Sequence, residues 1–410
     1  MIRKKVLVLG PGSRCYREYL LRQLADEYDV YLFSERHNDW ADEYSTVQRE
    51  VNLFDPVAIA EAVGLLGISP DGILSWDERF VIAAADLAEK LGLLGPTGVG
   101  IRGCRDKQLN RQRLASAGLI QPRVKFCVDE SQAVGAAEEL GYPVVVKPRG
   151  MGGSIGVRLA RARDELALAF HDADKLSLDG AMPFRHGALV ESYLDGEEIS
   201  IDGVSAKGAY IPVFIARKVV GLVPYFEELG HSVAASDPLL NYDVLIEALR
   251  VAHAAIGFQD GITHTEVKLT SEGPAIVEIN GRLGGDLIPY LAQLATGIKP
   301  GLIAGQIAVG DPVDLWAPVA SNAAIAFLYP AEPLVFAGLK NQPEPRDTAS
   351  GYLTSVVQLA AAGQRLAPPP DEFMSRIAYA ITVGADPETA LRISNQILKQ
   401  LDIASSPQNA

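Results

Sequence analysis

Residues 263–282 place four chemically active side chains at alternating positions. The stretch consists of two runs of alternating apolar and polar residues joined by a Gly-Pro turn, a pattern that predicts a β-hairpin. Side chains two positions apart on a strand share a face, so Glu278, Asn280 and Arg282 should point the same way, and Glu266 on the partner strand can lie beside them. Two carboxylates and an amide oxygen suit Mg²⁺ or Mn²⁺, and Arg282 could hold a transferring phosphoryl group or a substrate carboxylate. The alternative is a solvated sheet face with a surface ion pair.

A second signal is the glycine-rich segment that follows Lys147. A short apolar run leads to this lysine, and residues 150–156 then contain four glycines. Glycine has no Cβ, so the backbone N–H groups of such a loop can converge on an anion, and the lysine adds a mobile charge for phosphate oxygens. Taken alone, the segment could equally be a flexible hairpin with a surface lysine. The Walker-type loop G-x-x-x-x-G-K-[ST] is absent from the sequence.

Several other polar residues give weaker signals. His264 lies two positions from Glu266 and therefore faces the same side of the strand, where it could serve a substrate or a metal, or be a satisfied core histidine. His231 could line a substrate pocket or lie on a loop, and Arg217 could meet a carboxylate. Residues 76–78, Trp-Asp-Glu, could form an acidic patch on the substrate side, although a solvated helix cap is the more ordinary explanation.

The chain begins with alternating strands and helices. The apolar runs predict strands at 5–9, 30–33 and 72–75 and helices at 16–27, 56–64 and 80–91. This alternation predicts a parallel α/β sheet covered on both faces. The turn at 10–12 lacks the third glycine of a dinucleotide-binding loop, because Cys15 stands there, so we expect an ordinary turn whose amides could touch a substrate carboxylate. Later, residues 198–223 alternate like antiparallel strands.

Composition excludes several classes of protein. The 410 residues include 37 Lys plus Arg and 51 Asp plus Glu, a net charge of −14 that disfavours nucleic-acid or anionic membrane partners. Three scattered cysteines with no C-x-x-C pair disfavour a disulfide framework and a cysteine zinc site, which predicts a reducing, cytoplasmic location. The sequence contains no run of about 18 apolar residues, so it predicts no membrane span.

In this order along the chain, these signals resemble the ATP-grasp superfamily over roughly residues 100–310. The resemblance rests on Lys107, the glycine-rich loop after Lys147, Glu191-Ser192-Tyr193-Leu194, Glu198, Glu266 and Glu278-Ile279-Asn280-Gly281-Arg282. Within the superfamily the chain is most similar to the L-amino-acid ligases, through residues 261–266, residues 282–286 and the Gly230-His231 pair. The proline that usually follows that pair is replaced by the segment 232–235, which leaves the identity of the substrate open.

The resemblance implies an α/β protein with the ATP-grasp fold. We expect an N-terminal parallel α/β domain on the substrate side at 1–102, a first ATP-grasp part with a small lid domain at 103–195, and a larger α+β C-terminal domain at 196–410. It also implies ATP as cosubstrate, two Mg²⁺ or Mn²⁺ ions, small-molecule substrates and a homodimer at the level of the family.

The resemblance also assigns roles to residues. Lys147 and Arg282 would be catalytic, Arg282 by holding an acyl phosphate and then its tetrahedral successor. The residues implied for ATP are Lys107, Lys147, Gly152, Gly153, Ser154, Glu191, Tyr193, Leu194 and Glu198. Those implied for the metals are Glu266, Glu278 and Asn280, and those implied for substrates are His231, His264, Arg217, Arg282, Gly284 and Gly285.

The activity that the resemblance implies is an ATP-dependent carboxylate–amine ligase. It would join two amino acids or similar molecules through an acyl phosphate and release ADP and phosphate. Two alternatives stay open: another ATP-grasp chemistry, of the biotin-carboxylase or purine-pathway kind, and a non-catalytic nucleotide-binding module.

Overall fold

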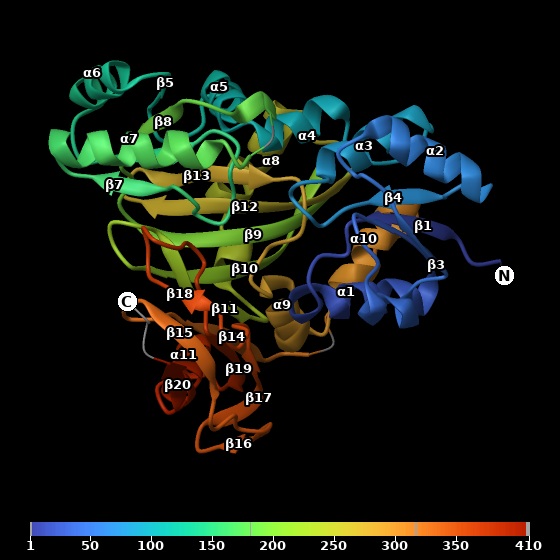
Figure 1. Ribbon diagram of the computed structural model, residues 1–410. Coiled ribbons are helices and arrows are strands. Elements are labelled where there is room, and N and C mark those ends of the chain that lie inside the picture. Colours follow the sequence, from blue (N-terminus) through green and yellow to red (C-terminus); the bar gives the residue numbers. More distant parts are fainter. Residues whose placement is uncertain (1, 181, 316, 318, 407–410) are drawn as a thin grey trace.

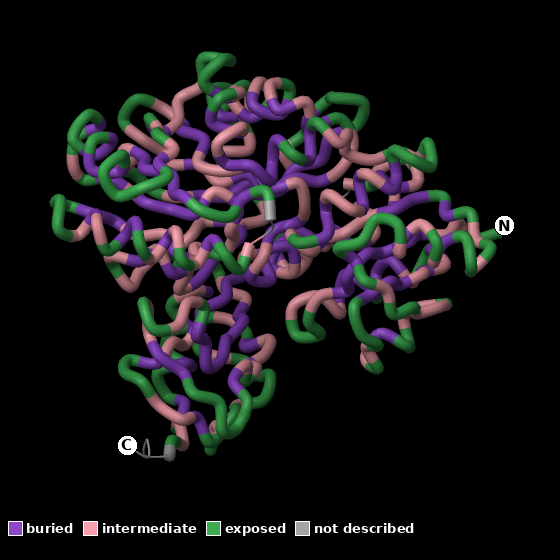
Figure 2. Tube along the Cα trace, turned by 45° about the horizontal axis from the view of Figure 1, so that its top comes forward, coloured by how far each residue is buried: buried purple, intermediate pink, exposed green. Residues whose placement is uncertain are grey.

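The computed structural model describes residues 2–180, 182–315, 317 and 319–406. Figure 1 shows a large antiparallel sheet in the middle of the molecule, a blue α/β unit on one side, a small sheet with two helices above it, and a C-terminal region in orange and red below. Figure 2 shows buried chain running through each of these regions, with exposed chain mostly in the outer turns. The expected ATP-grasp architecture is therefore organised around one sheet that all other parts contact.

The N-terminal unit is a four-stranded parallel sheet with the order β3-β2-β1-β4. Its strands are β1 (Lys5–Leu9), β2 (Asp29–Ser34), β3 (Val47–Glu50) and β4 (Gly72–Leu74), and its helices are α1 (Arg14–Glu27), α2 (Pro56–Leu66) and α3 (Val81–Lys90). Residues 6–9 of β1 are fully buried, as expected for a strand covered by helices on both faces. The predicted parallel α/β arrangement is confirmed.

The lid region is an antiparallel sheet with the order β5-β8-β6-β7. Its strands are β5 (Val124–Cys127), β6 (Val144–Pro148), β7 (Arg158–Ala160) and β8 (Ala188–Ser192). The helices α4 (Gly98–Arg105) and α5 (Lys107–Ser116) precede it, and α6 (Glu130–Leu140) and α7 (Arg163–Ser177) pack on it. Both helices pack on the face that carries Val144 and Val146, and the opposite face, with Val145 and Lys147, lines a cleft.

The central sheet has nine strands in the order β13-β12-β9-β10-β11-β14-β19-β17-β16. They are β9 (Glu197–Ala206), β10 (Ala209–Gly221), β11 (Glu227–Ala234), β12 (Gly261–Thr270), β13 (Gly273–Asn280), β14 (Asn322–Leu328), β16 (Arg346–Thr348), β17 (Gly351–Gln358) and β19 (Ala378–Gly384). The helices α8 (Asp243–Ile256), α9 (Ile288–Thr296) and α11 (Pro387–Leu398) pack on it, whereas α10 (Pro300–Val309) packs mainly against α1 and β4 of the N-terminal unit. A small sheet of β18 (Arg365–Leu366), β15 (Leu334–Leu339) and β20 (Ile403–Ser406) ends the chain.

Two sequence predictions about this sheet are confirmed. Residues 198–223 form the antiparallel pair β9 and β10, and residues 263–282 contain the hairpin of β12 and β13. The N-terminal unit and the central sheet share one apolar core, which contains Val6 and Leu20 of the former and Ile325 of the latter. Among the described residues, no helix combines the length and the apolar character that crossing a membrane requires.

Candidate functional site

The cleft between the lid sheet and the central sheet gathers most of the predicted residues. It has an empty volume of about 950 Å³. The predicted residues that line it are Lys107, Lys147, Gly152, Gly153, Ser154, Glu191, Tyr193, Leu194, Glu198, Glu266, Glu278, Asn280 and Arg282. These residues come from α5, the strands β6, β8, β9, β12 and β13, and the loops between them. Residues more than 150 positions apart therefore converge on one cavity.

The hairpin of β12 and β13 places its two glutamates side by side. Glu266 pairs with Glu278 across the strands, and His264 pairs with Asn280. Val267 and Ile279 are fully buried in the core on the other face, so the alternation of the strands sends the carboxylates into the cleft. Burial raises the pKa of Glu266, and the neighbouring carboxylate of Glu278 adds to this, while Lys218 acts in the opposite direction.

Two buried lysines approach these carboxylates. Lys107 Nζ lies 2.7 Å from Glu278 Oε1 and donates to the carbonyl oxygen of Met151 at 2.6 Å. Lys147 Nζ lies 2.8 Å from Glu191 Oε2. Burial lowers the pKa of Lys147, although Glu191 partly offsets this. Both ammonium groups therefore reach the cleft and could meet the oxygens of a phosphate chain.

The carboxylate of Glu191 forms ion pairs with two cationic side chains, Arg111 and Lys147. Arg111 Nε donates to it at 2.8 Å, and Arg111 also donates to the carbonyl oxygen of Val277 at 2.6 Å. Burial opposes ionisation, but Arg111 and Lys147 together hold the pKa of Glu191 at about 2. Glu191 thus fixes Lys147, and Tyr193, which directly follows β8, lines the cleft. Sequence analysis did not identify Arg111.

One further lysine pairs with three carboxylates that line the cleft. Lys218 Nζ lies 2.6 Å from Glu198, 2.7 Å from Glu228 and 3.3 Å from Glu266. The side chains of adjacent strand residues alternate, so the neighbouring Arg217 points to the opposite face of β10. There its Nε lies 2.9 Å from Asp237 Oδ2. Arg217 is not among the residues that line the cleft.

The glycine-rich loop covers the cleft with irregular backbone. Gly153 and Ser154 have φ values of 65° and 57°, in the left-handed region that favours glycine. The amide of Val157 donates to the carbonyl oxygen of Ser154 at 3.0 Å, which closes a turn. A Cβ on Gly153 would lie 2.7 Å from the sulfur of Met374, so the C-terminal region also contacts this loop.

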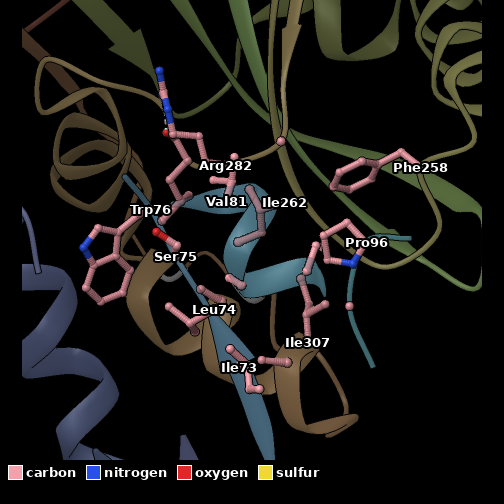
Figure 3. A pocket seen from close by; sticks show the side chains of 18 residues that line it. Ile73, Leu74, Ser75, Trp76, Val81, Pro96, Phe258, Ile262, Arg282 and Ile307 are labelled. Carbon is pink, nitrogen blue, oxygen red and sulfur yellow. Dashed lines mark hydrogen bonds between the residues drawn. The ribbon is translucent and has the colours of Figure 1, made fainter. Parts of the chain in front are cut away.

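Arg282 lies where the cleft meets the N-terminal unit. Its Nε forms an ion pair with Glu78, and its Nη1 donates to the carbonyl oxygen of Leu283 at 2.8 Å. Arg282 also borders a second, mostly apolar pocket with an empty volume of about 600 Å³, lined by Trp76, Phe258 and other residues. Figure 3 shows its guanidinium directed away from that pocket.

Glu78 is not a solvated helix cap. Its side chain is only 16% exposed, and Arg105 Nη1 lies 2.5 Å from it. Burial opposes ionisation, yet Arg282, Arg105 and Lys107 hold the pKa of Glu78 at about 2. The carboxylate is therefore charged and enclosed by cations.

The two predicted histidines are buried. His231 is fully buried, and its Nε2 lies 3.4 Å from both Glu228 and Asp286. Despite burial, these carboxylates raise its pKa. His264 Nδ1 lies 2.5 Å from Asp202. Neither histidine lines the cleft, so both support polar groups around it.

The two predicted glycines follow Arg282. The amide of Gly284 donates to Asp202 at 2.9 Å, and its carbonyl oxygen accepts from Arg17 at 3.0 Å. A Cβ on Gly284 would lie 2.8 Å from His264 Nδ1, whereas Gly285 has open space. Neither glycine lines the cleft.

Asp286, next along the chain, carries a bidentate ion pair that sequence analysis did not identify. Arg376 Nη1 and Nη2 both donate to it at 2.6 Å. The pair lies inside the protein and connects the loop after Arg282 to β19, because Arg376 precedes that strand.

Comparisons with known proteins show what the chain is similar to. Residues 140–290 match a family model described as an ATP-grasp domain. The alanine–anticapsin ligase of Bacillus subtilis (strain 168) is 27% identical over 294 residues, which cover 67% of this chain and 61% of that protein. Carnosine synthase 1 of Gallus gallus is 25% identical over 330 residues, which cover 72% of this chain and 36% of that protein. The chain thus matches less than two thirds of the length of these relatives.

A solved structure matches along the whole chain. The L-amino acid ligase from Bacillus licheniformis superimposes with a TM-score of 0.81 and 20% sequence identity, covering 99% of this chain and 100% of that one. At this identity the match concerns the fold.

Proposed function

Since the chain belongs to the ATP-grasp superfamily, we propose that it is an ADP-forming carboxylate–amine ligase. It joins two amino acids or related small molecules through an acyl phosphate and releases ADP and phosphate. The observation that carries this proposal is the cross-strand pair Glu266 and Glu278 in one cleft with Lys107, Lys147 and Arg282. Similarity to the alanine–anticapsin ligase supports amino acids as the substrate class.

The acidic pair fits divalent cations. Glu266 and Glu278, with the amide oxygen of Asn280, present hard oxygen donors on one face of the hairpin. Burial raises the pKa of Glu266 and the nearby carboxylate of Glu278 adds to this, and a bound cation would favour the charged form against both effects. These three residues would hold Mg²⁺ or Mn²⁺, two ions in all, and such ions would neutralise the phosphate chain.

The remaining cleft residues bind different parts of the nucleotide. Lys107 and Lys147 attract the phosphate oxygens, and the amides of residues 152–154 cover them. The segment at Tyr193 and Leu194, between β8 and β9, receives the adenine, and Glu198 receives the ribose hydroxyls. Because Glu191 pairs with Lys147, its part in this scheme is to aim that lysine.

Arg282 serves the acyl group. A carboxylate is a poor electrophile, because its charge and resonance resist attack by an amine, and phosphorylation gives it a leaving group. This transfer requires alignment and charge neutralisation, with no covalent protein nucleophile. Arg282 pairs with the acyl phosphate and then with the oxyanion that forms as the amine attacks. The glycine-rich loop excludes water, which would hydrolyse the intermediate.

The test is a matrix of amino-acid pairs incubated with ATP and Mg²⁺, scored by ADP, phosphate and product mass. The proposal expects ADP, phosphate and a condensed product for at least one pair. AMP and pyrophosphate would overturn the acyl-phosphate route. ADP release that needs bicarbonate and no amino acid would favour biotin-carboxylase-like chemistry, and ATP binding without ADP release for any pair would favour a nucleotide-binding module.

A further inference from the structure

The segment after β13 is held by side chains from separate parts of the molecule. From the N-terminal unit, Glu78 pairs with Arg282, and Arg17 donates to the carbonyl oxygen of Gly284 at 3.0 Å. From β9, Asp202 accepts from the amide of Gly284 at 2.9 Å. Residue 282 therefore sits on a backbone that is fixed from two sides, with Glu78 acting directly on its guanidinium.

The turn that carries Glu78, between β4 and α3, is itself rigid. Ser75 Oγ donates to the carbonyl oxygen of Leu9 at 2.7 Å, and Trp76 Nε1 donates to that of Pro11 at 2.9 Å. Trp76 is 2% exposed. Figure 3 shows Ser75 and Trp76 beside the segment from which Arg282 rises. The turn thus presents the carboxylate from a fixed position.

Glu78 also lies against the base of the glycine-rich loop. A Cβ on Gly152 would come within 4.0 Å of Glu78 Cγ. Arg105, which pairs with Glu78 at 2.5 Å, donates to the carbonyl oxygen of Gly150 at 3.1 Å. The carboxylate therefore touches both the arginine proposed for the acyl phosphate and the network under the loop proposed for the nucleotide.

We propose that Glu78 is the positioning residue for Arg282, and that through it the N-terminal unit takes part in the chemical step. This inference rests on the function proposed above. An arginine side chain has many rotamers, and the Glu78 carboxylate selects the one that enters the cleft. The guanidinium is then already aligned when charge develops on the acyl group, which is where preorganised donors have their largest effect.

The test compares Glu78→Gln, which removes the charge at constant size, with Glu78→Asp, which keeps the charge. Glu61→Gln on the exposed face of α2 is the matched control. We expect Glu78→Gln to lower kcat by about 10- to 100-fold, because misplacing a catalytic group by about 1 Å can cost about 100-fold. The KM for ATP should change by less than about threefold, since other residues hold the nucleotide, and Glu78→Asp should recover part of the rate.

A double-mutant cycle shows whether Glu78 acts through Arg282. If it does, Glu78→Gln combined with Arg282→Gln is no slower than Arg282→Gln alone. Additive losses, or a Glu78→Gln variant that loses thermal stability but keeps the wild-type kcat, would overturn the inference. A Glu78→Gln variant with a raised kcat and a lower KM for the carboxylate substrate would also overturn it. Such a result would mean that the Glu78 carboxylate competes with the substrate for Arg282.

The two proposals fail differently. Wild-type protein that turns over no substrate pair contradicts the ligase function, whereas active wild-type protein with a fully active Glu78→Gln variant contradicts the positioning role alone. A crystal structure of Glu78→Gln gives a readout without turnover. We expect its Arg282 guanidinium to turn away from residue 78, and an unchanged, well-ordered guanidinium would contradict the inference.

Discussion

The ammonium group of Lys218 on β10 lies 3.3 Å from a carboxylate oxygen of Glu266 on β12, and only β9 lies between these two strands. The same nitrogen lies 2.6 Å from Glu198 and 2.7 Å from Glu228, and the Lys218 side chain is 2% exposed. Burial alone would lower the pKa of Lys218, but the three carboxylates hold it well above its ordinary value. The Lys218 ammonium therefore pairs both with Glu198, which is proposed to bind the ribose, and with Glu266, which is proposed to bind metal.

Replacing Lys218 with methionine should destabilise the protein. Three carboxylates that are 13–21% exposed would lose a shared, buried partner. Removing one partner of a fully buried ion pair typically costs about 3–5 kcal/mol, and we expect a loss toward the lower end of that range. Because a divalent cation can restore the missing charge at Glu266, Mg²⁺ should raise the melting temperature of this variant more than that of the wild type. Thermal unfolding with and without Mg²⁺ measures both effects.

An exposed ion pair on α8 supplies the control. The side chains of Arg250 and Glu247 are 59% and 58% exposed. Arg250→Met should leave the melting temperature nearly unchanged, because exposed ion pairs are weak, and should leave the response to Mg²⁺ unchanged. Equal losses in the two variants would show that the Lys218 cluster has no special part in the acidic site.

The local pattern of the sequence predicts the parts of the site that lie on single strands or loops. Alternation in β12 and β13 identifies the face of Glu278, Asn280 and Arg282, because strand periodicity is a local property. The glycine content of residues 150–156 likewise marks an irregular loop. The helix α8 was not identified, although the helical spacing of Leu245, Leu249, Ala252 and Ile256 was available as a signal.

Long-range partners could not be predicted in this way. Glu78 is 204 positions from Arg282, and Asp286 is 90 positions from Arg376. Each residue taken alone is an ordinary charged residue, and only the packing of the N-terminal unit and β19 against the central sheet brings the partners together. Arg217 and Lys218 make the same point at close range, since only the structure shows that Lys218 pairs with Glu198 and Glu266 of the cleft while Arg217 pairs with Asp237.

Glu278→Gln should abolish ADP release while the protein stays folded. The amide keeps the size of the side chain but removes the charge proposed to bind metal, and it weakens the 2.7 Å contact with Lys107. Glu272→Gln, on the exposed turn of the same hairpin, should keep the wild-type rate. Circular dichroism checks the fold, and near-full activity of Glu278→Gln would show that the metal assignment is wrong.

Gly153→Ala should destabilise the glycine-rich loop by about 1–2 kcal/mol, because alanine disfavours its φ of 65°. Its new methyl group would also lie 2.7 Å from the sulfur of Met374. Gly152→Ala is the matched control, since its backbone is not left-handed and a Cβ there has room. Urea unfolding should show a loss for the first variant and little change for the second, and equal effects would contradict the left-handed geometry of Gly153.

His253 should make stability depend on pH. It is fully buried and stacks on Tyr210, with the two ring centroids 3.7 Å apart. Its Nε2 accepts a hydrogen bond from the Thr263 hydroxyl, and its Nδ1 donates one to the carbonyl oxygen of Leu249. Burial lowers its pKa from 6.5 to about 4. Between these values the unfolded chain binds a proton that the folded protein does not, so stability falls as the pH falls through this window.

The contribution of His253 is therefore complete above pH 6.5 and lost progressively down to about pH 4. The loss between about pH 7 and about pH 5 should be about 2 kcal/mol. His253→Gln cannot titrate, so its free energy of unfolding, although lower at neutral pH, should decrease by about 2 kcal/mol less than that of the wild type over this interval. Urea unfolding of both proteins at the two pH values measures how much the free energy of unfolding changes in each. The contributions of the other titrating groups are common to both proteins and cancel in the comparison. Parallel pH dependences would mean that His253 is protonated equally readily in the folded and unfolded states.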